Sequence, residues 1–246
     1  MHSTYDDAIP SQAAPRKRAG RSLQAHLIFW IAGGACLVLD LWSKEWAFST
    51  LGPTEVRRAI PGFLEFRRSL NDGAVFGAFT GQTGLFVAAS ILAIGFVTYL
   101  FATSGARHFG LHMALGMILA GALGNLYDRG FVKADVVRPI RNGTGHRDAF
   151  IGVRVGEPIG ESIRVGDWPD GTNARTYRLD EIELRRQGVV RDFLKFVPRF
   201  PSWVPRLNGR DVWPWVFNVA DSALVCGVIV LILFSGRDHR RSEPSA

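Results

Sequence analysis

The sequence predicts a membrane α-helical fold with four transmembrane helices, a small extracytoplasmic β-sheet and a β-rich insertion in the second outer loop. Hydrophobic residues make up 47% of the 246-residue chain, and they are concentrated in a few stretches. A helix needs about 20 apolar residues to cross the ~30 Å hydrocarbon core of a bilayer. Four nearly uncharged stretches reach or approach this length: residues 27–41, 84–102, 109–126 and 215–234.

The basic residues beside these stretches predict how the helices are oriented. Cytoplasmic loops of membrane proteins carry an excess of lysine and arginine. Basic residues precede the first stretch, join the second to the third, and follow the fourth: Arg16, Lys17, Arg18, Arg21, Arg107, Arg237, Arg240 and Arg241. We therefore expect both termini in the cytoplasm and the links 49–83 and 127–214 on the outer side.

The first outer link, 49–83, has a β-type pattern. Pro61 and Gly62 mark a turn, because both residues are strong turn formers. Apolar and charged residues then alternate roughly over 63–70, a pattern typical of strands rather than helices. We expect a small sheet that lies at the outer membrane surface.

The second outer link contains an insertion at residues 130–187, which is rich in Gly and Arg and lacks a helical period. Short strands are expected near 150–156 and 161–167, with turns between them. Loops of this length are usually functional or carry their own structure. The sequence leaves open whether the insertion is a substrate lid, a wall-contact module or a neutral addition.

The chain accordingly divides into five segments. The polar N-terminal tail has a composition typical of disorder. The expected order is a disordered cytoplasmic tail (1–24), three helices with the outer β-rich loop (25–129), the insertion (130–187), a final outer segment with the fourth helix (188–236) and a cytoplasmic tail (237–246).

Polar residues interrupt two of the apolar stretches. Asn218 and Asp221 lie in the fourth, and Asn125 and Asp128 repeat the same three-residue spacing in the third, where Arg129 follows. An ionisable residue inside a membrane span is by default a candidate for function. The simplest interpretation is that these residues make polar contacts between helices. A proton relay or transporter is a second reading, although the chain lacks the inverted repeats that many transporters have.

Asp40 and Lys44 are spaced i, i+4 at the outer end of the first stretch. Such a pair is commonly a salt bridge along one helix face. It could instead brace a nearby site. The sequence does not decide between these two roles.

The residue types present favour carboxylate chemistry. The six histidines do not cluster with the polar positions, as a metal site would require. We find no serine nucleophile motif. Two close carboxylates can share one proton, so that one activates water while the other polarises a carbonyl group. Asp221 would need a second carboxylate as its partner.

Four short motifs occur in order along the chain. They are DLWSK (residues 40–44), NDGAVFG (residues 71–77), GNLYDR (residues 124–129) and FNVAD (residues 217–221). Together with the predicted spans, they resemble the motifs of signal peptidase II, the lipoprotein signal peptidase. That resemblance implies an aspartyl endopeptidase of the bacterial cytoplasmic membrane, with residues 188–236 as its catalytic segment and fourth helix.

The resemblance also implies a catalytic pair of aspartates. One lies in the Phe-Asn-x-Ala-Asp motif, which matches Asp221, and the other lies in a Gly-x-Val-x-Asp-Phe segment. Asp192 in GVVRDF (residues 188–193) matches this second segment but lies 64 residues after Asp128, whereas Asp135 lies only seven residues after it. Because motif context outweighs spacing, we expect Asp192 to be the partner, and Asp135 remains the alternative.

The other motif residues receive roles from the same resemblance. Asn71, Gly73, Asn125, Arg129 and Asn218 are expected to bind or orient the substrate or the aspartates. Asp40, Lys44 and Asp128 are expected to support them. A diacylglyceryl-modified prolipoprotein would be the substrate, cleaved before its lipidated cysteine, and its lipid chains would remain in the membrane.

Several partners and cofactors are not expected. We expect no metal and no other cofactor. The net charge of +7 is largely explained by residues that flank spans, and we find no nucleic-acid-binding motif. Cys36 and Cys226 fall in predicted spans and are expected to be small packing residues. We expect a monomer. A catalytically inactive membrane scaffold whose function lies in the insertion is the remaining alternative.

Overall fold

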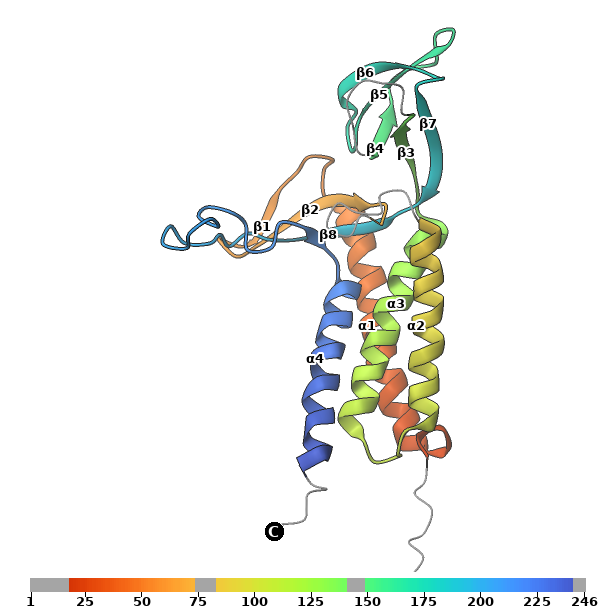
Figure 1. Cartoon of the computed structure of the whole chain (residues 1–246), viewed down its shortest axis with the longest axis vertical. Coiled ribbons are helices and arrows are strands. Elements are labelled where there is room, and N and C mark those ends of the chain that lie inside the picture. Colours follow the sequence, from red (N-terminus) through yellow and green to blue (C-terminus); the bar gives the residue numbers. More distant parts are fainter. Residues whose placement is uncertain (1–17, 74–82, 141–148, 241–246) are drawn as a thin grey trace, which may run out of the picture.

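The computed structural model describes residues 18–73, 83–140 and 149–240, with only the backbone for 235–240. It contains a helical bundle, a sheet that extends sideways across one end of the bundle, and a second sheet beyond the first (Figure 1). The expected tails at 1–17 and 241–246, and residues 74–77 of the second motif, lie outside the described residues.

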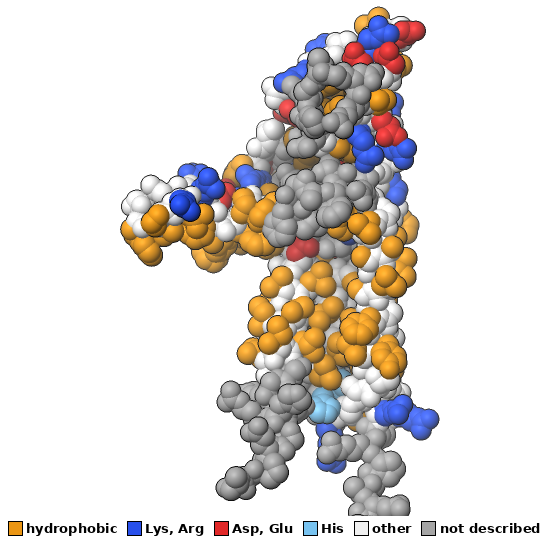
Figure 2. Space-filling model, viewed as in Figure 1, with side chains coloured by type: hydrophobic (Ala, Val, Ile, Leu, Met, Phe, Trp, Pro, Cys, Tyr) orange, Lys and Arg blue, Asp and Glu red, His pale blue; other side chains and the backbone are white. Residues whose placement is uncertain are grey.

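Four helices form the bundle: α1 (Leu23–Thr50), α2 (Thr83–Thr103), α3 (Phe109–Phe131) and α4 (Val219–Arg240). Within the described residues, α1, α2 and α3 are each long and apolar enough to cross a membrane, whereas the apolar part of α4, Val219–Phe234, is shorter. Hydrophobic side chains cover the visible face of the helical part (Figure 2). Three of the four expected spanning helices therefore meet the requirement by length and composition.

Helix α3 packs against all three other helices. Glycines allow this close approach. A Cβ atom on Gly116 would collide with the carbonyl oxygen of Phe29 in α1, and one on Gly121 would collide with Ala220 in α4. Its central place explains why α3 buries so many residues while α2 buries only Val97 and Phe101.

The described segment just before α1, residues 18–22, has more regular structure than expected. Residues 18–22 had been assigned to a disordered tail, but Ala19–Arg21 form a 3-10 helix, and the backbone N–H of Ala19 donates to the carbonyl oxygen of Ser104 at 2.8 Å. Ser22 then caps α1, because its side chain accepts a hydrogen bond from the backbone of Ala25. This segment is ordered because it packs on the link between α2 and α3.

The first sheet is antiparallel and has the order β1-β2-β8-β9. Its strands are β1 (Arg57–Ile60), β2 (Leu64–Asn71), β8 (Val190–Phe196) and β9 (Val216–Phe217). The strands expected in link 49–83 are confirmed. The sheet also recruits β8 and β9 from the far end of the chain, which alternation within the first link could not predict.

The second sheet is the insertion, and it has the order β6-β5-β4-β3-β7. Its strands are β3 (Lys133–Pro139), β4 (Phe150–Arg154), β5 (Ser162–Asp167), β6 (Thr172–Arg178) and β7 (Ile182–Gly188). Strands β4 and β5 confirm the two expected ones. A small apolar core of its own, built on Val137, Ile163, Val165 and Ile182, holds this sheet together.

Candidate active site

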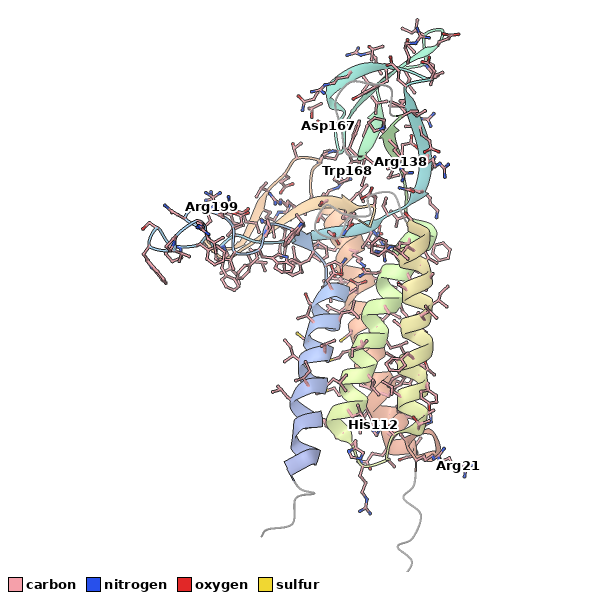
Figure 3. All side chains as sticks on the ribbon, viewed as in Figure 1. Arg21, His112, Arg138, Asp167, Trp168 and Arg199 are labelled. Atoms are coloured by element: carbon pink, nitrogen blue, oxygen red, sulfur yellow. The ribbon has the colours of Figure 1, made fainter. Side chains whose placement is uncertain are left out.

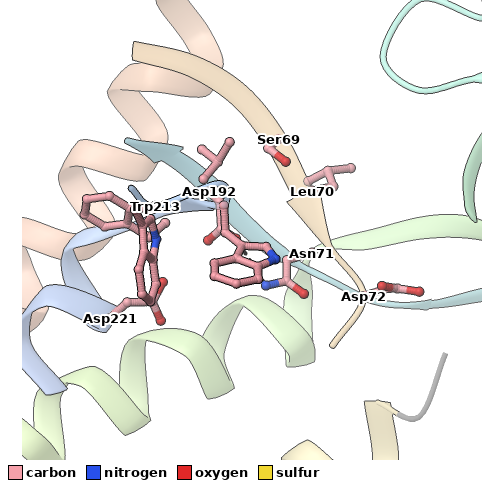
Figure 4. Close-up of a pocket in the computed structure, with 10 residues that line it drawn as sticks. Ser69, Leu70, Asn71, Asp72, Asp192, Trp213 and Asp221 are labelled. Carbon is pink, nitrogen blue, oxygen red and sulfur yellow. Dashed lines mark hydrogen bonds between the residues drawn. The ribbon is translucent and has the colours of Figure 1, made fainter. Parts of the chain in front are cut away.

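The polar motif residues gather where α1, α3 and α4 meet the first sheet. A cavity of about 400 Å³ opens there. Asp192 on β8 and Asp221 on α4 both line it, and Asn71 on β2 lies beside Asp192 (Figure 4). Residues from three distant parts of the sequence are thus brought to one site.

Asp221 lies nearer to the end of its helix than the apolar stretch 215–234 had suggested. Helix α4 begins at Val219, so Asp221 is in its first turn. The Asn218 side chain accepts a hydrogen bond from the backbone of Asp221 at 2.9 Å, and the Asp221 carboxylate accepts one from the backbone of Asn218 at 3.1 Å. This reciprocal pair is a capping box. The helix dipole further favours a carboxylate at this end.

Asn218 connects the two candidate aspartates. Its side chain is fully buried, and its amide nitrogen donates to Oδ1 of Asp192 at 2.6 Å. The same amide nitrogen donates to Oδ1 of Asn125 at 3.1 Å. Asn218 therefore fixes Asp192 by its side chain while its backbone and side chain hold Asp221.

Asn125 is oriented by Lys44. The ammonium group of Lys44 can only donate, and it lies 3.2 Å from Oδ1 of Asn125. The amide nitrogen of Asn125 must then face the other way, where it donates to Oδ1 of Asp221 at 2.8 Å. The expected orienting role of Asn125 thus has a physical basis.

Asp40, Lys44 and Asp128 form a fully buried ionic cluster behind the cavity. Lys44 Nζ lies 2.8 Å from Asp40 and 3.4 Å from Asp128. Asp40 also accepts a hydrogen bond from the backbone of Ala220 at 2.8 Å, so α1 is tied to the start of α4. Asp128 accepts from the backbone and guanidinium group of Arg191, next to Asp192. The Asp40–Lys44 pair is therefore a salt bridge, and its contacts with Asn125 and Ala220 connect it to the candidate site.

Asp192 is almost fully buried, with 2% of its surface exposed. Burial first, and then the nearby charge of Asp221, raise the pKa of its carboxyl group to about 8. Hydrogen bonds from Asn218 and from Asn71, the latter at 3.2 Å, oppose this shift. At neutral pH the carboxyl group of Asp192 is therefore mainly protonated.

The remaining motif residues, Gly73 and Arg129, do not line the cavity, and both approach the ring of Phe86. Gly73 has φ = +101°, and a Cβ atom there would collide with the ring of Phe86. The backbone N–H of Gly73 donates to the side chain of Asn71 at 2.9 Å, which orients that amide. The Arg129 guanidinium lies over the Phe86 ring at 5.1 Å. Its Nε is buried without a hydrogen-bond partner among the described residues.

Asp135 lies in the insertion, away from this cluster of contacts. It is on β3, where its carboxylate accepts a hydrogen bond from Arg154 at 2.8 Å. It is not among the residues that line the cavity.

Sequence reasoning missed an aromatic wall of the cavity. Trp213 and Trp215 line it and pack edge to face at 5.1 Å. Lys195 holds this wall, since its ammonium donates to Asp211 and to the carbonyl oxygen of Trp213, both at 2.7 Å. The ammonium also keeps the pKa of Asp211 below its usual value. The only sequence signal was the pair of tryptophans just before the FNVAD motif.

These features define a class: a helical membrane protein in which the first sheet and the adjacent helix ends enclose two carboxylates held by buried amides. Comparison with known proteins identifies the particular family. The family model "Signal peptidase (SPase) II", of the peptidase A8 type, matches residues 32–236, and the chain belongs to that family.

Curated relatives agree with the family assignment. The chain is 32% identical over 215 residues to a lipoprotein signal peptidase of Rhodopirellula baltica. This match covers 83% of this chain and 68% of the relative. It is 26% identical over 220 residues to a lipoprotein signal peptidase of Desulfitobacterium hafniense, and this match covers 88% of this chain and all of the relative.

Solved structures show a related fold. A bacterial membrane enzyme determined in meso at 2.3 Å resolution superposes with a TM-score of 0.56 at 18% identity, and the match covers 94% of this chain and 98% of that one. A second, at 1.9 Å resolution, gives a TM-score of 0.51 at 20% identity. At this level of identity the likeness concerns the fold alone.

Proposed function

We propose that this chain is a lipoprotein signal peptidase that works as an aspartyl endopeptidase. It would remove the signal peptide from diacylglyceryl-modified prolipoproteins by hydrolysis before the lipidated cysteine. The observation that carries the proposal is the placement of Asp192 and Asp221 on one cavity, joined through Asn218. Family membership supports the same activity.

The two carboxyl groups would divide the work. Asp221, ionised, takes a proton from a water molecule, which attacks the scissile carbonyl carbon. Asp192, protonated at neutral pH because of its raised pKa, donates its proton to the carbonyl oxygen. The tetrahedral intermediate then collapses as the C–N bond breaks. The proton held by Asp221 passes to the leaving amine, and one hydroxyl group of the intermediate returns a proton to Asp192 as the new carboxyl group forms. General acid–base catalysis of this kind contributes about 10²–10⁴-fold.

The surrounding residues would hold the substrate. The Arg129 guanidinium, with its unpartnered Nε, and the Asn71 amide lie beside the aspartates and suit peptide carbonyl or lipid-proximal ester oxygens. Gly73 keeps the chain close to Phe86 and orients Asn71. Positioning by such groups supplies catalysis beyond acid–base help.

The membrane arrangement follows the charge pattern. We propose that α4 is a fourth span, because its 22 residues extend for about 33 Å at 1.5 Å per residue. Both termini would then lie in the cytoplasm of a bacterium, and the aspartates would lie near the outer face of its cytoplasmic membrane. There the diacylglyceryl chains of the substrate can stay in lipid while its peptide bond reaches the cavity.

The direct test is cleavage of a prolipoprotein by the purified chain in lipid bilayers. We expect a lipidated precursor to be cut before its modified cysteine, and the same precursor without the diacylglyceryl group to be cut poorly or not at all. Mass spectrometry of the products locates the cleaved bond. If the folded chain leaves the lipidated precursor intact, the proposal is wrong, and the alternative of a catalytically inactive membrane scaffold replaces it.

The rate of cleavage should fall as the pH rises through about 8. A raised pKa means that Asp192 is protonated below this pH and loses its proton above it, so the acid needed at the carbonyl oxygen disappears on the alkaline side. Asn71 donates to the ionised form and opposes the shift. Replacing Asn71 by Ala should therefore move the alkaline limb of the kcat profile to higher pH. An alkaline limb that stays in place in this variant would contradict the assignment.

A further inference from the structure

The insertion is joined to the catalytic body by a narrow stalk. Strands β3 and β7 pair from Lys133 and Gly188 onward, directly after α3 ends. The backbone of Val189 donates to the carbonyl oxygen of Val132 at 3.0 Å and closes the base of this stalk. Two strands alone would let the sheet tilt about its base, so a second contact is needed to fix its position.

That second contact is made by Trp168, in the turn between β5 and β6. The Arg68 guanidinium lies over two neighbouring aromatic rings, 5.1 Å from the centre of Phe48 in α1 and 5.5 Å from the centre of Trp168. The centres of these two rings are 6.3 Å apart and their planes are 28° from parallel, so Trp168 also packs directly on Phe48. Arg68 also donates to the carbonyl oxygen of Leu51, at 3.4 Å. In Figure 3, Trp168 lies on the part of the insertion nearest the first sheet.

The stack is the main support of the Arg68 side chain. Within the described part of the chain, Nε of Arg68 is buried and has no hydrogen-bond partner. A guanidinium that lies over two neighbouring aromatic rings is attracted to both of them. Removing one face would leave the guanidinium with a single ring and one long hydrogen bond.

The turn presents Trp168 in a defined position. The backbone of Gly171 donates to the carbonyl oxygen of Asp167 at 2.9 Å, and the Asn173 amide donates to the Asp167 carboxylate at 3.0 Å. Trp168 itself donates from its backbone to Ile151 on β4 at 3.2 Å. The indole is therefore carried by a braced turn rather than by a free loop.

Arg68 occupies the part of β2 that leads into the active site. The pairing of β2 with β8 is irregular between Phe66 and Ser69, so Arg68 lies in a bulge. Immediately after the bulge, Ser69 is opposite Asp192 in the register, and Asn71 donates to the Asp192 carboxylate. Ser69, Leu70, Asn71 and Asp72 all line the cavity. A displacement of Arg68 would therefore displace the cavity-lining residues that directly follow it in β2.

We propose that the insertion is a positioning element for the active site, and that it acts through the Phe48–Arg68–Trp168 stack. By fixing Arg68, the insertion fixes the end of β2 and so the hydrogen bond from Asn71 to Asp192. This role rests on the proposed function of Asp192. Trp168 and Arg68 are positioning residues, because neither lines the cavity.

The first test compares variants of the stack in prolipoprotein cleavage. Trp168→Ala should lower kcat about tenfold with little change in KM, because misplacement of a catalytic group by 1 Å can cost about 100-fold in rate. It should also move the alkaline limb of the kcat profile in the same direction as Asn71→Ala. Trp168→Phe keeps an aromatic face and should restore most of kcat. Arg68→Lys keeps the charge but loses the flat surface, so it should resemble Trp168→Ala.

Trp203→Ala is the matched control, because Trp203 is 79% exposed on the loop after β8 and its loss should leave kcat unchanged. If Trp168→Ala lowers kcat no more than Trp203→Ala does, the proposal is overturned. The same is true if kcat falls but the alkaline limb does not move, since a merely structural role predicts that result.

A second measurement tests the stack without using activity. Spin labels at Thr50→Cys and Thr176→Cys, with Cys36 and Cys226 replaced by Ala, report the distance between the end of α1 and the insertion. We expect one narrow distance distribution, which broadens with Trp168→Ala and narrows again with Trp168→Phe. A distribution unchanged by Trp168→Ala overturns the contact. If the unmodified chain cleaves no prolipoprotein while the distances behave as expected, the proposed function has failed and the docking of the insertion stands.

Discussion

Asparagine in place of either Asp192 or Asp221 is expected to abolish cleavage of a lipidated prolipoprotein. Each substitution keeps the size of the side chain and leaves an oxygen that can accept the amide hydrogen bonds of Asn218 or Asn125. What is lost is the ability to give or take a proton, so the rate should fall by at least about 10²-fold. Cleavage assays on purified variants in lipid bilayers measure this loss.

Asp135→Asn is the matched control for the two variants. Asp135 pairs with the half-exposed Arg154 in the insertion, and loss of such a pair costs about 0–1 kcal/mol. Cleavage should therefore be largely retained. Retention of activity in Asp192→Asn together with its loss in Asp135→Asn would show that Asp135 is the partner of Asp221. Melting temperatures close to that of the unmodified chain exclude misfolding as the cause of either result.

Lys44→Met should cause the largest loss of stability of any single change at the site. Methionine has a similar volume but no charge, so Asp40 and Asp128 would stay buried without the cation they share. Breaking a buried ion pair by removing one partner costs about 3–5 kcal/mol. Asn125 would also lose the donor that orients its amide toward Asp221, so catalysis should fall as well. Thermal unfolding in detergent, followed alongside cleavage, measures both effects.

Lys133→Met provides the comparison for Lys44→Met. Lys133 is exposed and makes one hydrogen bond to the carbonyl oxygen of Arg129, at 2.9 Å. Its replacement should change the free energy of unfolding by no more than about 0.5 kcal/mol. If both variants melt at the same temperature, the buried cluster does not hold the helices together as argued here.

The helical part of the fold could be predicted from local sequence alone. Apolar stretch length predicted α1, α2 and α3, because the bilayer sets the length of a spanning helix. The boundary of α4 could not be predicted in this way. Asn218 and Asp221 are preceded by apolar residues, and hydropathy does not distinguish a capping box at a helix start from polar residues inside a span.

The sheets were predicted only in part. Alternation indicated strands in residues 63–70 and in the insertion, and β2, β4 and β5 are there. The pairing of β2 with β8 joins residues more than 100 positions apart. Strand pairing over such distances depends on which helices bring the ends together, and nothing in either strand specifies it.

The motifs selected the chemical groups of the candidate site, but not their mutual arrangement. Asn125 was expected to bind or orient the substrate or the aspartates. The direction in which its amide points follows from its contact with Lys44, which is 81 residues away in the sequence. Phe86, Trp213 and Lys195 carried no motif and were missed. Their roles depend on which backbone segments approach Gly73 and the cavity wall.

The sequence by itself determined the family-like set of polar residues, the apolar helices and the presence of a β-rich insertion. These depend on residue type and local spacing, which the chain carries in any conformation. Only the tertiary structure decided that Asp221 lies in the first turn of a helix, that Asn218 connects it to Asp192, and that Trp168 reaches Arg68. Each of these depends on contacts between distant segments, whose geometry exists only after α1, α3, α4 and the two sheets have packed together.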